Sequence, residues 1–181
     1  IKKYKEKCIF GIGKETDDVV NTIAWTSYKE ALKKRNQDSA THILAFVDKD
    51  IAANSRGWLL NYNKLEDGVF WNDSFAQSKK FAVQLLEGDS ADNIAGIERL
   101  SDITKERFNI RVSGVGKATA NKVLADCKTE KELAMRVYEC YSASWEEDWY
   151  ERMNEMGFFL YLLRSEKDKW DIEKYLKTGL K

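Results

Sequence analysis

The chain has 181 residues, of which 43% are hydrophobic and 12% aromatic, and this composition is typical of a packed globular protein and excludes a disordered chain. It has no apolar run near the roughly 18 residues of a membrane span, so we expect a cytoplasmic protein with no membrane partner. Thirty Lys and Arg residues balance thirty Asp and Glu residues, so the net charge gives no direct indication of nucleic acid.

The cysteines and histidine argue against a zinc site. Cys8, Cys127 and Cys140 form no Cys-x-x-Cys pair, and His42 is the only histidine. We therefore expect reduced thiols, and we expect oxygen ligands for any metal that the protein binds.

The first half of the chain predicts an α/β fold with part of a parallel sheet. A short apolar run at 8–12 favours a buried strand, the pattern over 15–35 predicts a helix, and 41–47 predicts a second buried strand. This order of strand, helix and strand is typical of a parallel sheet. Two further segments, 57–63 and 68–72, predict a short hairpin at the sheet margin.

The second half of the chain is expected to be helical. A helix is predicted from about 73 to 86, and the aromatic-rich stretch 145–163 predicts another. We place a domain boundary between 1–87, the α/β part, and 88–181, the helical part. Five residues at helical spacing predict a core stripe on the aromatic-rich helix: Trp149, Met153, Met156, Phe159 and Leu160.

Three acidic clusters follow or precede these elements. They are Glu15 with Asp17 and Asp18, Asp48 with Asp50, and Asp89 with Asp92. The first two clusters are expected at the carboxyl edge of the sheet, where ligands gather, and the third could reach the same place. Carboxylates brought so close would raise one another's pKa unless a cation compensated them, so the pattern predicts a two-metal site for Mg²⁺ or Mn²⁺.

Each acidic cluster also has a purely structural interpretation, which the sequence leaves open. Asp17 and Asp18 could favour a helix N-terminus, Asp48 and Asp50 could form a turn, and Asp89 could cap a helix. Their joint placement at one sheet edge favours the metal interpretation.

A glycine turn that enters a helix follows the acids. Gly114 and Gly116 allow a close approach of backbone, and Lys117 and Lys122 add positive charge, as in a helix-hairpin-helix unit that contacts DNA phosphates without reading sequence. A simple turn with solvated lysines is the alternative. A Walker A phosphate loop does not fit, because Arg111 stands where that motif needs its first glycine.

Together these motifs resemble the 5′ nuclease family of flap endonucleases and 5′–3′ exonucleases. The resemblance is carried by Glu-Thr-Asp-Asp at 15–18, Val-Asp-Lys-Asp-Ile at 47–51, Gly-Asp-Ser-Ala-Asp-Asn at 88–93 and the glycine hairpin over 112–124. Two departures stand out. The segment 98–111 separates the acids from the hairpin, and no early acidic strand or helical arch precedes residue 1. We therefore expect the chain to be the C-terminal portion of a longer nuclease.

The resemblance implies roles for particular residues. The metal ligands or supporting acids would be Glu15, Asp17, Asp18, Asp48, Asp50, Asp89 and Asp92, with Asp48, Asp50 and Asp89 central to catalysis. Duplex phosphates would be held by Gly114, Gly116, Lys117, Thr119 and Lys122, with K⁺ expected at the hairpin.

The implied activity is metal-dependent removal of nucleotides from 5′ ends of duplex or flapped DNA, or of an RNA–DNA hybrid, in phage-type replication within the host cytoplasm. The missing N-terminal segment would complete the site, and this chain alone is expected to have doubtful activity. The main alternative is a non-catalytic helix-hairpin-helix module that binds DNA. A single-strand ribonuclease of the related PIN type is a second alternative, although it would lack the glycine hairpin.

Overall fold

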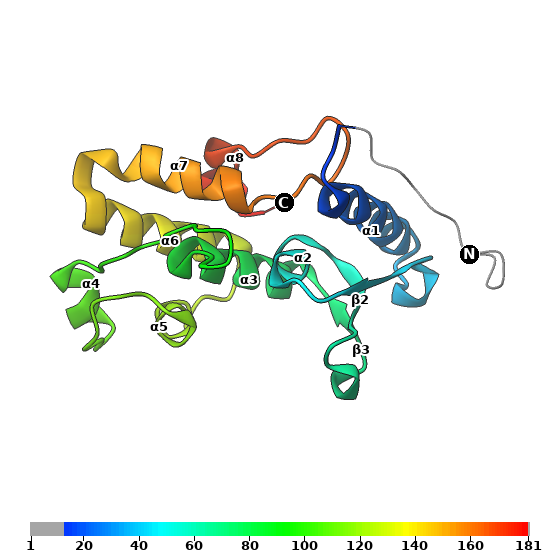
Figure 1. Ribbon diagram of the computed structural model, residues 1–181, viewed down its shortest axis with the longest axis horizontal. Coiled ribbons are helices and arrows are strands. Elements are labelled where there is room, and N and C mark those ends of the chain that lie inside the picture. Colours follow the sequence, from blue (N-terminus) through cyan, green and yellow to red (C-terminus); the bar gives the residue numbers. More distant parts are fainter. Residues whose placement is uncertain (1–12, 181) are drawn as a thin grey trace.

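The computed structural model describes residues 13–180, so the strand expected at 8–12 and Cys8 lie outside the described part. The fold is mixed α/β, with one small sheet and mostly helices (Figure 1). None of the helices in this described range is long and apolar enough to cross a membrane.

The sheet has three strands in the order β1-β2-β3. Strands β1 (Ile43–Phe46) and β2 (Gly57–Asn61) are parallel and are connected by the short helix α2 (Lys49–Asn54). Strand β3 (Val69–Asn72) returns antiparallel to β2 and lies at the sheet edge, so the predicted marginal hairpin is confirmed. The β1-α2-β2 unit places the end of β1 and the start of α2 at one edge of the sheet.

Strand β1 is less buried than the sequence predicts. Phe46 is buried on the inner face, whereas Ile43 and Val47 remain 56% and 41% exposed. The prediction of a fully buried strand is therefore wrong for the described chain, because only one face of β1 packs on the core and β2 is its one neighbour among the described strands.

Two long helices flank the sheet unit. Helix α1 (Thr16–Lys34) has acids in its first turn and lysines in its last, which suits the helix dipole, and it buries one face that includes Trp25 and Tyr28. Helix α3 (Ser74–Glu87) begins at Asp73, whose side chain accepts a hydrogen bond from the Ala76 N–H. The predicted ranges of both helices agree with the observed ones to within one or two residues.

The rest of the chain is helical, as expected. It contains α4 (Asp102–Arg107), α5 (Lys117–Val123), α6 (Glu130–Trp145), α7 (Trp149–Leu160) and α8 (Ile172–Thr178), and short 3₁₀ turns lie at Gln37–Ser39, Leu65–Asp67 and Glu146–Asp148.

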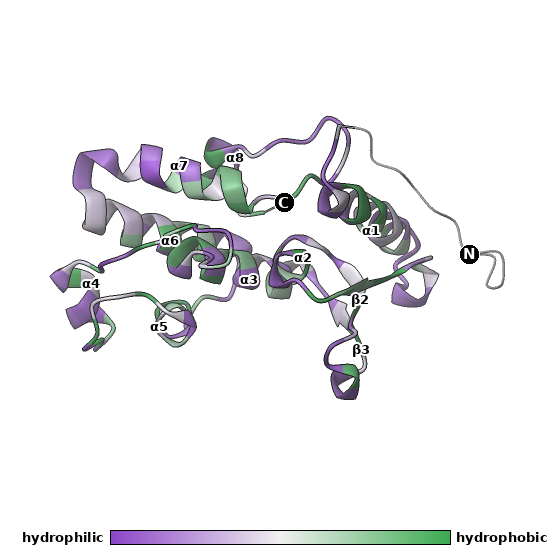
Figure 2. Cartoon of the chain, in the orientation of Figure 1, coloured by the Kyte–Doolittle hydropathy of each residue, from purple (hydrophilic) through white to green (hydrophobic). Residues whose placement is uncertain are grey.

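Helix α3 lies at the centre of the helical part. It contacts α5, α6 and α7, and its buried residues, including Phe81 and Leu85, belong to the same core as those of the later helices. The outer end of α7, away from the sheet, is coloured as hydrophilic (Figure 2). The predicted boundary after residue 87 thus falls between α3 and the helices on which it packs.

The aromatic-rich stretch is not one helix. Helix α6 ends at Trp145, the chain reverses at Glu146 with a positive φ of 46°, and α7 ends at Leu160. The prediction of a helix over 145–163 is therefore wrong at both ends. No glycine or proline marks either break, and residues that lie far away in the sequence hold the backbone beyond α7, as described below.

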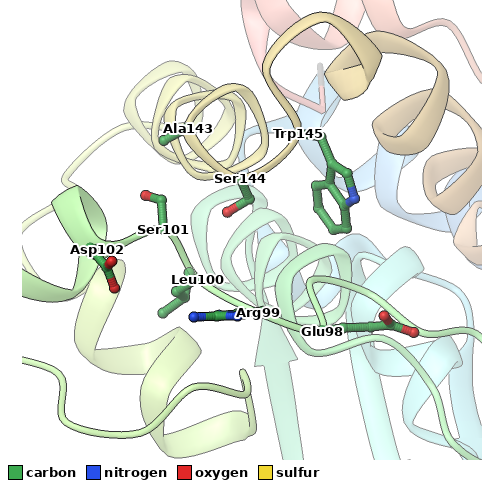
Figure 3. Close-up of a pocket in the computed structure, with 8 residues that line it drawn as sticks. All are labelled: Glu98, Arg99, Leu100, Ser101, Asp102, Ala143, Ser144 and Trp145. Carbon is green, nitrogen blue, oxygen red and sulfur yellow. The ribbon is translucent and has the colours of Figure 1, made fainter.

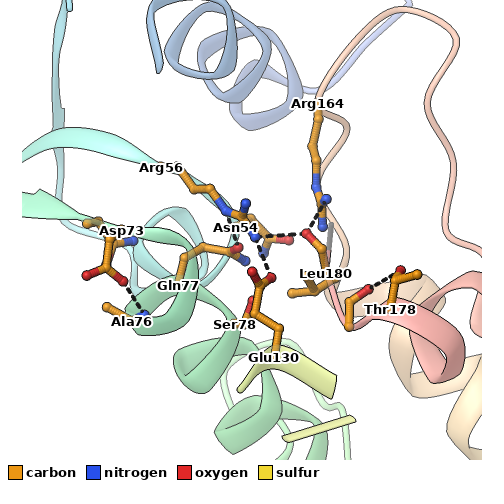
Figure 4. Close-up of polar contacts among 12 residues, drawn as sticks. Asn54, Arg56, Asp73, Ala76, Gln77, Ser78, Glu130, Arg164, Thr178 and Leu180 are labelled. Atoms are coloured by element: carbon orange, nitrogen blue, oxygen red, sulfur yellow. Dashed lines mark hydrogen bonds and ion pairs between the residues drawn. The ribbon is translucent and has the colours of Figure 1, made fainter. Parts of the chain in front are cut away.

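The sheet and helical parts are joined by a buried polar network (Figure 4). Arg56 donates from Nη2 to Glu130 Oε2 and to the Leu180 carbonyl, both at 2.8 Å, and from Nε to Gln77 Oε1 at 3.0 Å. Arg164 donates to the same Leu180 carbonyl. Because these groups are buried and hydrogen-bonded together, the network fixes α8 against the start of α3 and α6.

Candidate functional site

The first acidic pair lies at the N-terminus of α2. Asp48 is the N-cap residue, and its Oδ1 accepts a hydrogen bond from the Asp50 N–H at 3.0 Å. Asp50 follows in the first turn, where a carboxylate interacts favourably with the helix dipole. The structural interpretation of these acids as helix-capping residues therefore describes their local geometry.

The second acidic pair lies in a loop that closes on itself directly after α3. Asp89 and Ile94 exchange two backbone hydrogen bonds, of 2.8 and 2.7 Å. Gly88 and Gly96 have φ angles of 76° and 62°, and a Cβ on either would lie 2.2–2.3 Å from backbone of the facing strand of the loop. Only glycine fits both positions, so this sequence folds into a tight loop that holds Asp89 and Asp92 beside α2.

Three carboxylates meet where this loop faces α2. One oxygen from each of Asp50, Asp89 and Asp92 lies within 4.8 Å of the others. In the octahedron around one Mg²⁺ ion, neighbouring oxygens lie about 3 Å apart and opposite oxygens about 4.2 Å apart, so the three carboxylates would have to approach one another by up to about 2 Å to share one ion. An all-carboxylate set of this kind suits a hard divalent cation, and these three residues fit one.

A cavity of about 530 Å³ opens beside the three carboxylates. Its acidic lining residues are Glu15, Asp17, Asp48, Asp50, Asp92 and Glu155. Acids from α1, α2 and the loop after α3 therefore converge, as the sequence pattern predicts. A second wall of the same cavity comes from α7 and the segment after it, and it combines the apolar side chains of Met156, Phe159 and Leu162 with the carboxylate of Glu155.

The carboxylates perturb one another's protonation. Burial raises the pKa of Asp50 to about 6, with further contributions from the charges of Asp48, Asp89 and Asp92, although a hydrogen bond from Gln84 opposes the rise. Burial, followed by the charges of nearby aspartates, also raises the pKa of Asp17. Both shifts arise first from burial, which disfavours the charged form, and neighbouring carboxylates add to them.

Asp89 is the exception, because it has a cationic partner. Its Oδ2 lies 3.0 Å from Lys49 Nζ, and its Oδ1 accepts a hydrogen bond from the Ala91 N–H at 3.0 Å. Burial would raise the pKa of Asp89, which is 2% exposed, but these hydrogen bonds outweigh burial and lower it. The sequence did not lead us to predict this ion pair of Lys49. The one local indication was the position of Lys49 between two acids, Asp48 and Asp50.

Asp18 faces a different partner from the other predicted ligands. Its Oδ1 accepts a hydrogen bond from the backbone N–H of Leu163 at 2.8 Å. Asn21 donates to the Leu163 carbonyl at 2.9 Å, so α1 holds the segment that follows α7 through two side chains. Asp18 is absent from the residues that line the acidic cavity.

Asn54 completes this attachment from α2. Its side chain donates to the Leu160 carbonyl at 2.9 Å and accepts from the Leu162 N–H at 3.0 Å, and it is fully buried. We call residues 160–163 the strap. The strap brings the end of α7 to the acidic cavity, and the sequence signal was a lone asparagine at the end of the apolar run Ile51-Ala52-Ala53.

The glycine hairpin lies between α4 and α5. Gly116 is the N-cap of α5 and Lys117 is its first residue, while Val115 is 8% exposed and anchors the turn in the core. Gly114 and Gly116 have no positive φ, and a Cβ would meet only the Glu98 carbonyl, at 3.8 Å from Gly114. The fold itself therefore does not require glycine at either position.

A shallow cavity of about 410 Å³ lies beside the hairpin. Its lining includes Arg111, Thr119 and Lys122, and Lys122 Nζ donates to the Asn109 carbonyl at 2.7 Å. Gly114, Gly116 and Lys117 are exposed, so all five predicted phosphate-contacting residues lie in one stretch of the surface or its rim. The side chains offer cationic and hydroxyl donors with no acid among the lining residues.

Another cavity, of about 290 Å³, lies between the loop before α4 and the end of α6 (Figure 3). Arg99 and Trp145 line it, and Ser144 Oγ is buried with no hydrogen-bond partner among the described residues. None of the predicted site residues lines this cavity.

No protein-family model matches the chain, and no curated protein or solved structure matches it either.

Proposed function

We propose that the chain belongs to a metal-dependent 5′ nuclease that hydrolyses phosphodiester bonds at 5′ ends or flaps of DNA, or of an RNA–DNA hybrid. The proposal includes a fold of the PIN and 5′ nuclease kind with a helix-hairpin-helix unit. The observation that carries it is the cluster of Asp50, Asp89 and Asp92, whose oxygens lie within 4.8 Å of one another beside an acidic cavity.

In this proposal Asp50, Asp89 and Asp92 hold one divalent cation, and Glu15, Asp17 and Asp48 hold or orient a second. When bound, Mg²⁺ or Mn²⁺ lowers the pKa of a coordinated water and stabilises negative charge on the phosphate. The carboxylates neutralise the cations and fix their places, so no side-chain nucleophile is required.

Lys49 has a defined task in the same mechanism. It is half-exposed and extends from the start of α2 to the buried carboxylate of Asp89, which it neutralises. If Asp89 held a divalent cation, the ammonium group of Lys49 would be available to donate hydrogen bonds to a phosphate oxygen of the substrate. Lys49 thus keeps the acidic cluster folded before the metal arrives and supports phosphate binding afterwards.

In this proposal the hairpin contacts the backbone of the nucleic acid. Gly114 and Gly116 leave the backbone open to a bulky partner, which explains glycines that the fold does not require. Lys117, Thr119 and Lys122 add charge and a hydroxyl for phosphate oxygens. Contacts of this kind position a duplex without reading its sequence.

The test is metal binding and cleavage by the full-length protein. We expect Mn²⁺ to bind, and a 5′-labelled duplex with a single-stranded 5′ end to be cut in Mg²⁺ or Mn²⁺ but not in EDTA. Asp92→Asn should lose both properties, since Asp92 is exposed and its replacement leaves the core intact. The matched control is Asp67→Asn, an exposed acid in the β2–β3 connection, which should behave as wild type. Unchanged cleavage by Asp92→Asn would refute the proposed site.

A non-catalytic DNA-binding module is the second candidate. It is favoured by the Lys49–Asp89 ion pair and by the raised pKa of Asp50, which together let the acidic cluster persist without metal. Duplex binding that survives in EDTA, with no cleavage by the full-length protein under any divalent cation, would favour this candidate over the nuclease.

A further inference from the structure

Two adjacent phenylalanines near the end of α7 are exposed, and their rings contact each other edge to face with centroids 5.8 Å apart. Phe158 is 68% exposed and Phe159 is 58% exposed. Phe159 lines the cavity that holds the acids, whereas Phe158 does not. The sequence predicts Phe159 in a core stripe, and this is wrong: Met153 and Leu160 are buried, but the Phe159 ring faces the acidic cavity.

The position of Phe159 is fixed by the strap that follows it. Asn54 holds the Leu160 carbonyl and the Leu162 N–H, and Asp18 holds the Leu163 N–H. The backbone directly after Phe159 is therefore tied to α1 and α2, the same helices that position Asp17 and Asp50. Phe159 is therefore an exposed aromatic ring held at a fixed place beside the acidic cavity.

The cavity has two chemically different walls. One wall carries the carboxylates, and the other is formed by Met156, Phe159 and Leu162, with Ile94 nearby. Its volume of about 530 Å³ lies within the roughly 300–1,000 Å³ of small-molecule sites. A nucleotide matches both walls, because its phosphate needs the cations that the acids hold and its base is a flat, largely apolar ring.

We propose that Phe159 stacks on the base of the nucleotide whose phosphate is held at the acidic cluster. This inference rests on the proposed nuclease function and adds a residue that positions the substrate. Stacking on an aromatic side chain is tolerant of base identity, because every base presents a π-face. Phe159 has no hydrogen-bonding group, so it senses whether a base is present and does not distinguish one base from another.

The experiment measures binding of the full-length protein to a duplex with a short single-stranded 5′ end. The end nucleotide carries either adenine or no base, and Ca²⁺ replaces Mg²⁺ so that binding is read without cleavage. Wild type should prefer the base-bearing end by about tenfold, within the roughly 5- to 150-fold that base stacking provides. Phe159→Ala should lose this preference while keeping its affinity for the abasic end, and Phe159→Trp should restore it.

Phe158→Leu is the matched control and should keep the full preference, since Phe158 lies outside the cavity and leucine keeps an apolar side chain beside the Phe159 ring, which Phe158 contacts edge to face. A 2-aminopurine at the end position should be quenched by wild type and by Phe158→Leu but not by Phe159→Ala. An unchanged preference in Phe159→Ala, or an equal loss in both variants, overturns the stacking role and leaves the nuclease proposal standing. The absence of any metal-dependent binding to either end overturns both proposals.

Discussion

Replacing Asp50 by Asn should stabilise the metal-free protein and at the same time abolish its response to metal. Burial and neighbouring carboxylates raise the pKa of Asp50 from 3.8 to about 6. A shift of about two units corresponds to about 3 kcal/mol at neutral pH, and screening by water at this half-buried group reduces it to about 1–2 kcal/mol. Removing an acid from the first turn of α2 costs about 0.5 kcal/mol, so the net gain is about 1 kcal/mol.

The assay is thermal unfolding in EDTA and with added Mn²⁺. A gain of about 1 kcal/mol raises the Tm of a chain of this length by roughly 2–4 °C. Added Mn²⁺ should raise the Tm of wild type, since a ligand that binds only the folded state stabilises it, but should leave Asp50→Asn unchanged. Asp67→Asn is the control, because it removes an exposed acid far from the cluster.

The stability difference should also depend on pH in a defined direction. Because the folded-state pKa of Asp50 is raised above its unfolded value, wild type carries the full penalty above about pH 6 and loses it as the pH falls toward 3.8. The advantage of Asp50→Asn in EDTA should therefore shrink between pH 7 and about pH 4. A variant that is less stable than wild type at pH 7, or that still responds to Mn²⁺, would show that Asp50 has a structural role and does not ligate metal.

Three further changes test the surroundings of the site. Lys49→Met should destabilise the protein in EDTA by about 1–2 kcal/mol, because buried Asp89 loses its counter-charge, and saturating Mn²⁺ should recover most of the loss in thermal unfolding. Gly96→Ala should prevent closure of the acidic loop and lower the free energy of unfolding in denaturant by several kcal/mol. Gly114→Ala should change that free energy by under about 0.5 kcal/mol but weaken duplex binding. Equal losses of stability in the two variants would contradict the inference that only Gly96 is required by the fold. Asn54→Ala should cost about 3 kcal/mol, since it leaves buried backbone groups of the strap unpaired, and a neutral result would show that the strap is held by other contacts.

The local elements were predictable because their signals are local. The acids and lysines at the two ends of α1 and the two short apolar runs of β2 and β3, joined by a polar turn, each lie within a few residues. The convergence of Asp50, Asp89 and Asp92 was also predictable, because it follows from where strands and helices end. The close approach of the Gly88 and Gly96 backbones, which explains the loop geometry, is visible only in the folded structure.

The parts that the sequence did not predict depend on distant partners. Helix α7 stops at Leu160 because Asn54 takes the hydrogen bonds of the following backbone, and nothing within the aromatic-rich stretch signals it. The exposed ring of Phe159 has the same spacing as the buried Met153 and Leu160, so periodicity assigns it to the core. The ion pair of Lys49 with Asp89 was not predicted, because a lysine between two acids is usually a solvated residue.

The attachment of the strap has a consequence for how the protein is made. Asn54 and Leu160 are separated by 106 positions, so their contact cannot form until the chain as far as Leu160 has left the ribosome. A growing polypeptide therefore exposes its aspartates long before the opposing aromatic wall is in place. The complete cavity therefore assembles only after both of its walls have been synthesised.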